Sequence, residues 1–251
     1  MSHAGPLVWS SHAISHTGKV RKLNEDAYIE RPEIGLWAVA DGMGGHAAGD
    51  VASRTVVEAL ARVAPPRSLR ATVDDMEDQL LAANARLREL AHGYDDDRTI
   101  GSTVVSLLVY RQLGIVMWAG DSRAYLQRQG ALTQLTRDHS EVGELVRRGV
   151  ILAEDAEAHP SANVITRAIG AGDELFVDID AEGLQPGDTL LLCSDGLYRH
   201  LTDAEICEHL ARQDPETICR QLIALTLERG AQDNVTVLVV SLQAPAEGHD
   251  G

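Results

Sequence analysis

The feature that most constrains this chain is an aspartate that leaves a compact apolar segment and runs directly into glycine. Residues 36–40 are all apolar, and Asp41 and Gly42 follow them at once. Glycine lets a backbone carbonyl or amide approach a ligand closely, and it tolerates positive φ. The segment therefore predicts either a ligand-bearing turn at the end of a buried strand or a tight turn into a helix that Asp41 caps. Taken alone, it leaves both interpretations open.

The acidic balance of the chain excludes one large class of partners. Its 251 residues carry 22 Lys and Arg against 38 Asp and Glu, a formal net charge of −16. This charge opposes non-specific attraction to nucleic acid or anionic lipid and favours multivalent cations. Hydrophobic residues form 44% of the chain, which is enough for the core of one large domain or two small ones.

The sequence indicates neither a membrane anchor nor a disulfide framework. No apolar run approaches the roughly 20 residues of a membrane helix, and no basic segment precedes a hydrophobic signal region. We therefore expect a cytoplasmic protein. Cys193, Cys207 and Cys219 are odd in number and form no CxxC pair, so they predict free structural thiols.

Apolar periodicity predicts strands and helices in alternating groups. The expected strands are 7–15, 27–29, 36–40, 103–110, 114–119, 124–127, 131–135, 164–169, 175–179, 189–193 and 235–242. The expected helices are 51–63, one from an N-cap at Thr72 to Gly93, one opened by a capping box of Thr202 and Glu205, and one from an N-cap at Asp214 to Gly230. The four central strands suggest an antiparallel meander. The order of elements predicts an α+β layered fold with one core.

Two segments are predicted to lie outside this layered body. Residues 140–161 are charged and rich in alanine, with a short helical pattern at Val142, Leu145 and Val146, and they are interpreted as a surface flap or lid. Residues 244–251 are expected to form a frayed tail. We therefore expect a single domain over residues 1–243.

Acidic residues recur at the ends of the predicted strands. Folding the hairpin about Glu33 and Ile34 places Asp26 opposite Asp41, although a shift of one residue would put Glu25 there instead. Asp121 and Asp195 also follow predicted strands, and Asp233 precedes one; these three acids complete the set. Clustered carboxylates cannot all stay ionised without cations. With only oxygen ligands available, hard cations such as Mg²⁺ or Mn²⁺ fit best.

Six segments, taken together and in order, carry a family resemblance. They are Arg21-Lys22-Leu23-Asn24-Glu25-Asp26, Asp41-Gly42-Met43-Gly44-Gly45-His46, Gly101-Ser102-Thr103, Ala119-Gly120-Asp121-Ser122-Arg123, Cys193-Ser194-Asp195-Gly196 and Asp233-Asn234-Val235-Thr236. With these segments the chain resembles the bacterial form of the metal-dependent serine/threonine phosphatases of the protein phosphatase 2C family. The resemblance implies a four-layer α/β/β/α fold, in which helix pairs flank a central antiparallel β-sandwich.

The resemblance also implies a role for each site residue. Asp41 would bridge two metal ions, Glu25 and the Gly42 carbonyl would complete one site, and Asp195 and Asp233 would hold the other. Asp121 would help Asp195 to hold a weaker third ion. Asp26 would orient bound waters from behind the ligands, where Asn234 also lies, and Arg21 would grip the substrate phosphate with its paired donors.

The implied reaction is hydrolysis of phosphoserine or phosphothreonine in proteins, by attack of a water that bridges two Mn²⁺ or Mg²⁺ ions. Expected partners are the phosphorylated substrates of a serine/threonine kinase, and a monomer is expected. Many eukaryotic members carry a histidine after the Asp-Gly pair, where this chain has Met43. The general acid is therefore open among His46, His139 and metal-bound water. Cys193 receives no catalytic role, because nothing resembles the Cys-x5-Arg loop of cysteine phosphatases.

Two alternatives from other classes stay open at this point. One is a catalytically inactive binding module on the same fold that regulates a kinase pathway. Retention of all the core acids argues against it, since an inactive copy has no physical need for clustered carboxylates. The other is a nucleotide-binding protein that uses residues 42–49 as a phosphate cradle. It lacks both a Gly-Lys-Ser/Thr ending and a GxGxxG after a strand.

Overall fold

Two antiparallel sheets form the centre of the computed structural model, which describes residues 7–44, 48–93, 99–152, 155–156, 159–211 and 214–245. The first sheet contains, in spatial order, β1 (Val8–His16), β11 (Val235–Gln243), β10 (Thr189–Cys193), β7 (Arg123–Arg128) and β8 (Ala131–Gln134). The second contains β2 (Asp26–Arg31), β3 (Leu36–Met43), β5 (Val104–Tyr110), β6 (Leu113–Ala119) and β9 (Asp178–Gly183), with β4 (Gly101–Ser102) paired to β3.

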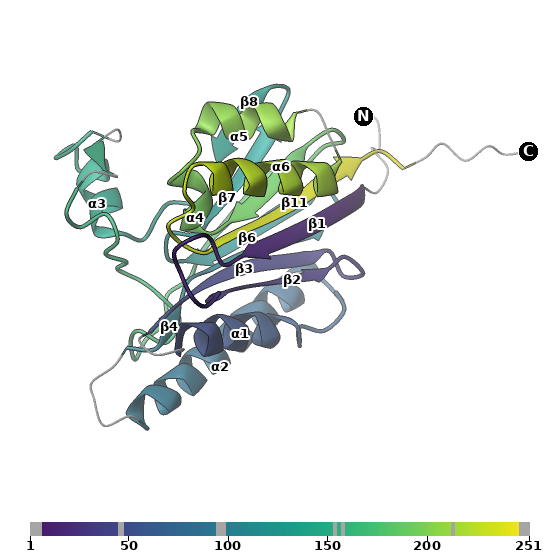
Figure 1. Ribbon diagram of the computed structural model, residues 1–251. Helices are drawn as coiled ribbons and strands as arrows, with labels where there is room; N and C mark the ends of the chain where they lie inside the picture. Colours follow the sequence, from purple (N-terminus) through teal and green to yellow (C-terminus); the bar gives the residue numbers. More distant parts are fainter. Residues whose placement is uncertain are drawn as a thin grey trace, which may run out of the picture.

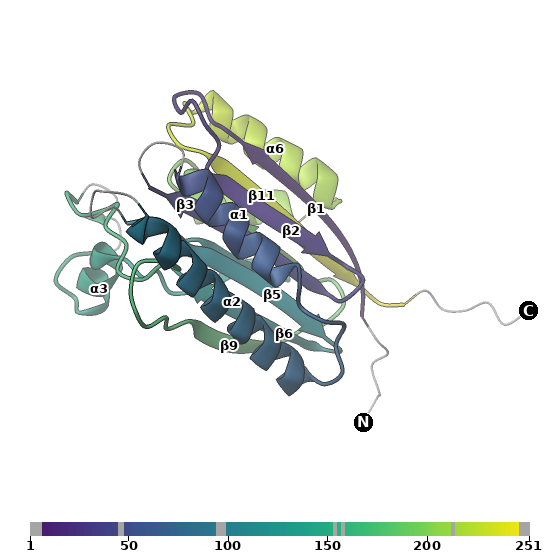
Figure 2. The same ribbon diagram turned by 90° about the horizontal axis from the view of Figure 1, so that it is seen from below.

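Helices cover the outer face of each sheet, as Figures 1 and 2 show. The second sheet is covered by α1 (Ala48–Leu60) and α2 (Leu69–His92), and the first by α4 (Asp195–Tyr198), α5 (Asp203–Leu210) and α6 (Pro215–Glu228). Three apolar layers result, one between the sheets and one under each helical layer. The predicted α+β fold with four layers and a central sandwich is confirmed.

The helix ends follow from local capping chemistry. Thr202 and Glu205 form the predicted capping box, and Asp214 caps α6 by accepting from Thr217 N–H, with Pro215 in the first turn. The predicted start of the second helix is wrong. Ser68 is the N-cap of α2, and Thr72 lies inside the helix, where its Oγ1 donates to the Ser68 carbonyl oxygen at 2.9 Å. Both residues have hydroxyls that can cap a helix. With Ser68 as the cap, α2 is one turn longer than predicted, and its face that packs on the sheet is longer too.

Three strand predictions are also wrong. The four central strands form no meander, because the chain leaves one sheet after β6 and enters the other as β7, through a turn at Gly120 with φ of +112°. Residues 164–169 contribute only isolated bridges, Ile165 to Ser140 and Ile169 to Ser102. The strand expected at 175–179 is instead β9, three residues later. β9 is an exposed edge strand, so its pairing with β6 does not require an apolar sequence.

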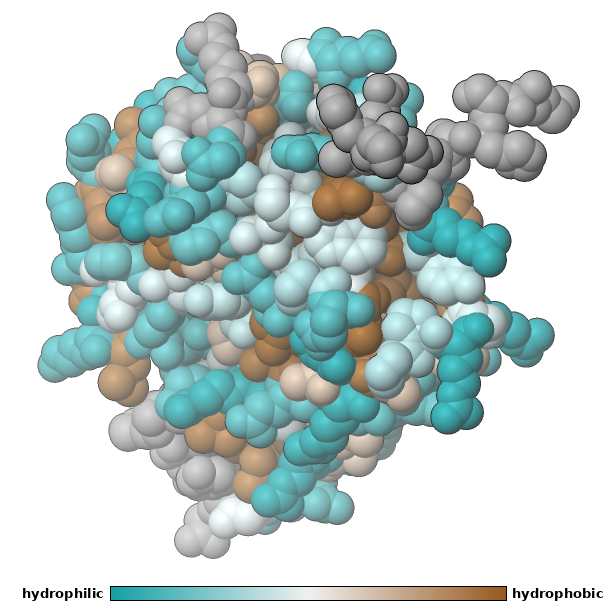
Figure 3. All heavy atoms as spheres, turned by 90° about the vertical axis from the view of Figure 1, so that its right-hand side faces the viewer, coloured by the Kyte–Doolittle hydropathy of each residue, from teal (hydrophilic) through white to brown (hydrophobic). Residues whose placement is uncertain are grey.

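The predicted flap stands out from the layered body. Its helix α3 (Glu141–Arg147) begins at Ser140, whose hydroxyl accepts from Gly143 N–H, and Figure 1 shows it projecting beyond the sheets. At the opposite end of the molecule, hydrophilic and hydrophobic residues are interspersed over the surface (Figure 3). In the part of the chain that the structure describes, no helix combines the length and apolar character needed to cross a membrane.

Candidate metal and phosphate site

Asp26 lies at the point where the two sheets meet. It is the Cα partner of Asp41 in the β2–β3 ladder, as the hairpin prediction requires. From the other sheet, the hydroxyls of Ser194 and Thr236 each donate to Asp26 Oδ2 at 2.7 Å. The register therefore assigns this position to Asp26 rather than Glu25. The two hydroxyl hydrogen bonds join the sheets at their acidic end.

Asp41 is held through its backbone by the segment that precedes β5. Its N–H donates to Thr103 Oγ1 at 2.9 Å, and its carbonyl oxygen accepts from Thr103 N–H at 2.8 Å. Ser102 Oγ donates to the same carbonyl oxygen at 3.0 Å, and Ser122 hydrogen-bonds to Thr103 Oγ1 at 2.7 Å. Because the backbone carries all of these bonds, the Asp41 carboxylate is left to face the other acids.

Two glycines allow the first helix to approach Glu25 closely. Gly42 N–H donates to the Glu25 carbonyl oxygen at 3.0 Å, and a Cβ on Gly42 would collide with the Gly49 carbonyl oxygen. A Cβ on Gly49 would lie 2.5 Å from Glu25 Oε1. Glu25 is therefore confined between the Asp41-Gly42 turn and the start of α1. The sequence explained Gly42 by its carbonyl alone and missed the requirement for Gly49.

Asn234 connects the segment that carries Asp233 to the loop that carries Glu25. Its Oδ1 accepts from Glu25 N–H at 2.8 Å, and its Nδ2 donates to the carbonyl oxygens of Thr17 and Leu23 at 2.9 Å. The neighbouring Asp233 accepts a hydrogen bond from Arg21 Nη2 at 2.7 Å. The loop that carries Arg21 and Glu25 is thus fastened to the start of β11.

Asp195 and Asp121 occupy the side of the site nearest the flap. Asp195 begins α4, and its Oδ2 lies 2.9 Å from Arg199 Nη2. Asp121 is only 3% exposed, and its Oδ2 lies 3.8 Å from the same nitrogen. Tyr198 Oη donates to the Asp121 carbonyl oxygen at 3.0 Å, which binds the turn after β6 to α4.

Burial and mutual repulsion raise the pKa of the acids. Burial, together with the charge of Asp195, raises the pKa of Asp26 to about 7, although the hydrogen bonds from Thr236 and Ser194 lower it. Burial and then the Asp195 charge raise the pKa of Asp121 to about 7. The pKa values of Asp41, Asp195 and Glu25 are raised too, with burial as the largest cause in each case. The cluster therefore resists full ionisation unless a positive charge joins it.

The donor set fits divalent metal ions of the hard type. In the described part of the chain, no hydrogen-bond donor reaches Asp26 Oδ1 or Asp195 Oδ1, although both atoms are buried. Buried carboxylate oxygens without a donor are suited to a cation or to its bound water. As the side chains stand, however, no three acidic, His or Cys groups of the described residues surround one point closely enough to hold an ion. Arg21 and Arg199 hold two of the acids instead.

His139, considered above as a general acid, is engaged on both ring nitrogens. Its Nδ1 accepts from Gly120 N–H at 3.2 Å, and its Nε2 lies 3.3 Å from Asp178 Oδ2 and 3.4 Å from Arg167 Nη1. The ring also stacks on Trp118. These contacts favour a structural role at the base of the flap. His46 lies outside the described residues, and Met43 pairs with Gly101 in the short β3–β4 ladder.

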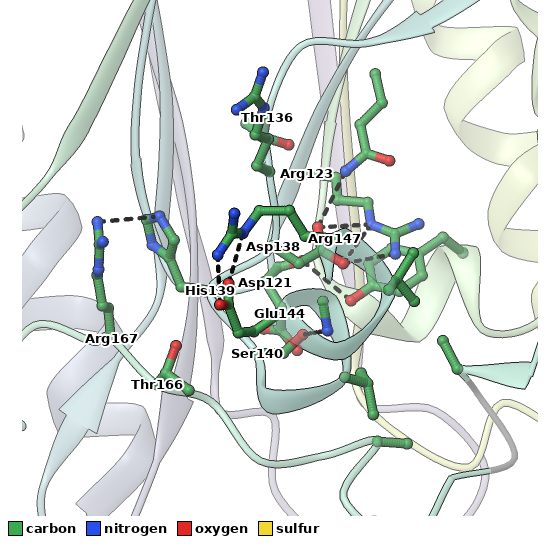
Figure 4. A pocket seen from close by; sticks show the side chains of 18 of the residues that line it. Asp121, Arg123, Thr136, Asp138, His139, Ser140, Glu144, Arg147, Thr166 and Arg167 are labelled. Carbon is green, nitrogen blue, oxygen red and sulfur yellow. Dashed lines mark hydrogen bonds and ion pairs between the residues drawn. The ribbon is translucent and has the colours of Figure 1, made fainter. Parts of the chain in front are cut away.

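A cavity of about 640 Å³ adjoins the acids, between the flap and the edge of the first sheet (Figure 4). Asp121 and Arg199 line the side toward the acids, and α3 lines the opposite side. Within it, Arg123 pairs with Asp138 at 2.7 Å and lies over the ring of Tyr198. The site therefore opens into a space that a substrate can enter beside the flap.

The chain is similar in sequence to known proteins over most of its length. Residues 16–233 match the protein phosphatase 2C family. This chain belongs to the protein phosphatase 2C family of metal-dependent serine/threonine phosphatases. The serine/threonine phosphatase Stp of Listeria innocua is 35% identical over 93% of this chain and 96% of its own length.

Solved structures of other proteins share the fold. PppA of Pseudomonas aeruginosa, described as a key regulatory component of its T6SS, is 44% identical with a TM-score of 0.86, covering 93% of this chain and 97% of that one. The catalytic domain of PstP in complex with two manganese ions is 36% identical with a TM-score of 0.84, covering 94% and 99%.

The acids that the sequence placed at strand ends lie together in the structure. The structure also shows contacts of these acids that the sequence analysis did not name. Three of these contacting residues, Ser194, Thr236 and Thr103, lie inside the quoted motifs, so the sequence could have indicated them. Tyr198 and Arg199 lie just beyond a motif, at the end of a helix of four residues that is too short to predict from periodicity.

Proposed function

We propose that this phosphatase removes phosphate from phosphoserine and phosphothreonine residues of proteins at a binuclear Mn²⁺ or Mg²⁺ centre. The observation that carries the proposal is the meeting of acids from both sheets around Asp26, with two buried carboxylate oxygens that no donor reaches among the described residues. A cluster of largely buried carboxylates repels itself, and bound cations would remove that repulsion.

The residues that would hold the ions come from five segments of the chain. Glu25, Asp41 and the Gly42 carbonyl would hold one ion, and Asp41, Asp195 and Asp233 the other. Asp121 would hold a weaker third ion together with Asp195. When bound, such ions lower the pKa of coordinated water and neutralise negative charge on a phosphate that is being transferred. The oxygen-only donor set suits Mn²⁺ and Mg²⁺ alike.

The remaining residues would position these ligands and the substrate. Asp26, fixed by hydroxyls of Ser194 and Thr236, would orient bound water through its free Oδ1. Asn234 would hold the Glu25 backbone. Arg21, whose side chain is 51% exposed and contacts Asp233, would turn to the substrate phosphate and bind it through two donors.

The substrates would be proteins phosphorylated by a serine/threonine kinase, and the phosphatase would act on them in the cytoplasm as a monomer. Residues 1–243 would work as one phosphatase domain, with the flap at 140–161 beside the substrate and 244–251 as a tail. The cavity between the flap and Asp121 supports this position for the flap.

The test is release of phosphate from a phosphothreonine peptide with and without Mn²⁺. We expect metal-dependent release by the wild type and a loss of at least about 100-fold in Asp41→Asn and Asp195→Asn. Asp74→Asn, on the exposed face of α2, is the matched control and keeps full activity. Equal release by wild type and both site variants would overturn the proposal, as would no release at all, which would favour the inactive binding module.

A second measurement separates substrate binding from metal binding. Arg21→Lys keeps the positive charge but loses the paired donors, so KM should rise about tenfold while metal affinity stays close to that of the wild type. An unchanged KM would contradict the role given to Arg21.

A further inference from the structure

Arg199 connects the buried acids to the flap through one side chain. Its Nη2 lies 2.9 Å from Asp195 Oδ2 and 3.8 Å from Asp121 Oδ2. Its Nη1 donates to the side-chain oxygen of Asn163, in the turn that directly follows the flap. The guanidinium is rigid and planar, so a shift of one end moves the other.

On the acid side, Arg199 supplies positive charge where we propose a metal ion. Asp195 and Asp121 are 9% and 3% exposed, so water screens their repulsion poorly. A divalent cation at the same two carboxylates would take over the contact at Asp195 Oδ2 and would repel the guanidinium. Arg199 and the ion therefore compete for the same oxygens.

On the flap side, the turn that contains Asn163 directly follows the flap and is hydrogen-bonded to it. Val164 N–H donates to the Ser161 carbonyl oxygen at 3.0 Å, and Glu141 N–H, at the start of α3, donates to the Val164 carbonyl oxygen at 2.9 Å. Asn163 itself is exposed. Its bond to Arg199 therefore attaches this exposed turn, and α3 with it, to the edge of the metal site.

We propose that Arg199 is a positioning residue that couples metal occupancy at Asp195 and Asp121 to the position of the flap. Without metal, Arg199 holds both the acids and Asn163, and the flap is drawn toward the site. With metal, the guanidinium leaves Asp195, and the turn at Asn163 is released. By linkage, a substrate that moves the flap outward raises metal affinity by the same factor. The inference rests on the metal sites of the proposed function.

Hydrogen exchange of the amides in the turn that follows the flap tests the coupling directly. In the wild type, saturating Mn²⁺ should make the amides of residues 162 and 164 exchange about fivefold faster, which is the lower end of typical coupling between sites. Asn163→Ala cuts the connection, and Arg199→Lys replaces the fork with a single ammonium group. In both variants, exchange at these amides should no longer respond to Mn²⁺. Arg148→Lys, whose arginine pairs with Glu144 within the flap, is the matched control and should respond like the wild type.

Calorimetric titration with Mn²⁺ provides the second arm. Arg199→Leu removes the competing cation, so affinity for the weakest ion should rise about fivefold, as expected for one partly screened ion pair. Unchanged affinity in Arg199→Leu, or a flap response to Mn²⁺ that persists in Arg199→Lys and Asn163→Ala, would overturn the coupling. Failure of the wild type to bind Mn²⁺ would overturn the proposed function as well. Metal binding with phosphatase activity but no flap response would overturn only the coupling.

Discussion

Asp26 and Asp41 face each other as Cα partners in the β2–β3 ladder, and Asp26 Oδ2 also accepts hydroxyl hydrogen bonds from Ser194 and Thr236 of the other sheet. One carboxylate therefore lies opposite Asp41 in the hairpin and links the two sheets. Its second oxygen has no donor in the described part of the chain. Structural and chemical demands meet in the same side chain.

Asp26→Asn separates those two demands. An asparagine oxygen still accepts both hydroxyl hydrogen bonds, so the fold should persist, with an unchanged circular dichroism spectrum. The negative charge behind the ligands is lost, so affinity for Mn²⁺ measured by calorimetry should fall about 10- to 100-fold. A variant that binds Mn²⁺ like the wild type would show that Asp26 serves the fold alone.

The stability of the metal-free protein should fall as pH rises. The folded-state pKa values of Asp26 and Asp121 are about 7, whereas unfolded aspartate titrates near 3.9. Between these values the folded state binds more protons than the unfolded state, so the free energy of unfolding decreases by up to about 1.4 kcal/mol per pH unit for each group. Stabilisation by these protonated groups is complete below about pH 4 and is lost above about pH 7.

Thermal unfolding in a chelating buffer between pH 5 and pH 8 measures this effect. Asp26→Asn cannot titrate at that position, so it should lose less stability over the range than the wild type. Adding Mn²⁺ should stabilise the wild type more at pH 8 than at pH 5, because metal binding at pH 8 displaces fewer protons from the carboxyl groups. Parallel loss of stability in the two proteins would rule out Asp26 as a source of the pH dependence.

Gly49→Ala should weaken metal binding more than it lowers the stability of the fold. The added Cβ would lie 2.5 Å from Glu25 Oε1, the end of a side chain that can move, and 2.8 Å from the Gly42 carbonyl oxygen. We expect a stability loss of about 1–3 kcal/mol, as in other overpacked sites, together with weaker Mn²⁺ binding. Gly183→Ala, where nothing lies within 4 Å of the new Cβ, is the control. If both variants bind Mn²⁺ alike, the close approach of α1 to Glu25 is not needed.

The three cysteines should differ in their reactivity toward an alkylating reagent. Burial raises the pKa of the Cys193 and Cys219 thiols to about 12, so both stay protonated and inaccessible in the folded protein. Iodoacetamide at pH 8 should label only Cys207, and all three after denaturation, as mass spectrometry will report. Cys193→Ala should keep phosphatase activity within about twofold. Labelling of Cys193 in the folded protein, or a large loss of activity in that variant, would contradict its structural role.

The parts of this structure that sequence could predict are those set by local chemistry. The turn at Glu33 and Ile34 fixes the hairpin register, and the capping residues Thr202 and Asp214 fix two helix starts. The acids could be placed together because each lies at the end of an apolar strand. The same local rules cannot choose between Ser68 and Thr72 as caps, since both residue types are suitable.

What could not be predicted depends on contacts between distant segments. β9 pairs through its backbone along an exposed edge, and its polar sequence carries no alternating pattern. The crossing between sheets after β6 is decided by the packing of both sheets at once. Arg199 reaches Asn163 across 36 positions of sequence, a contact that no periodicity encodes.

The nine-residue ladder between β1 and β11 joins the earliest strand of the fold to the latest. Asp233 and Asn234 lie immediately before β11, so the site lacks two of its residues until that strand has left the ribosome. During synthesis the nascent chain can therefore form the hairpin and its helices, but it cannot act on phosphoproteins. The site is therefore complete only when β11 takes its place between β1 and β10.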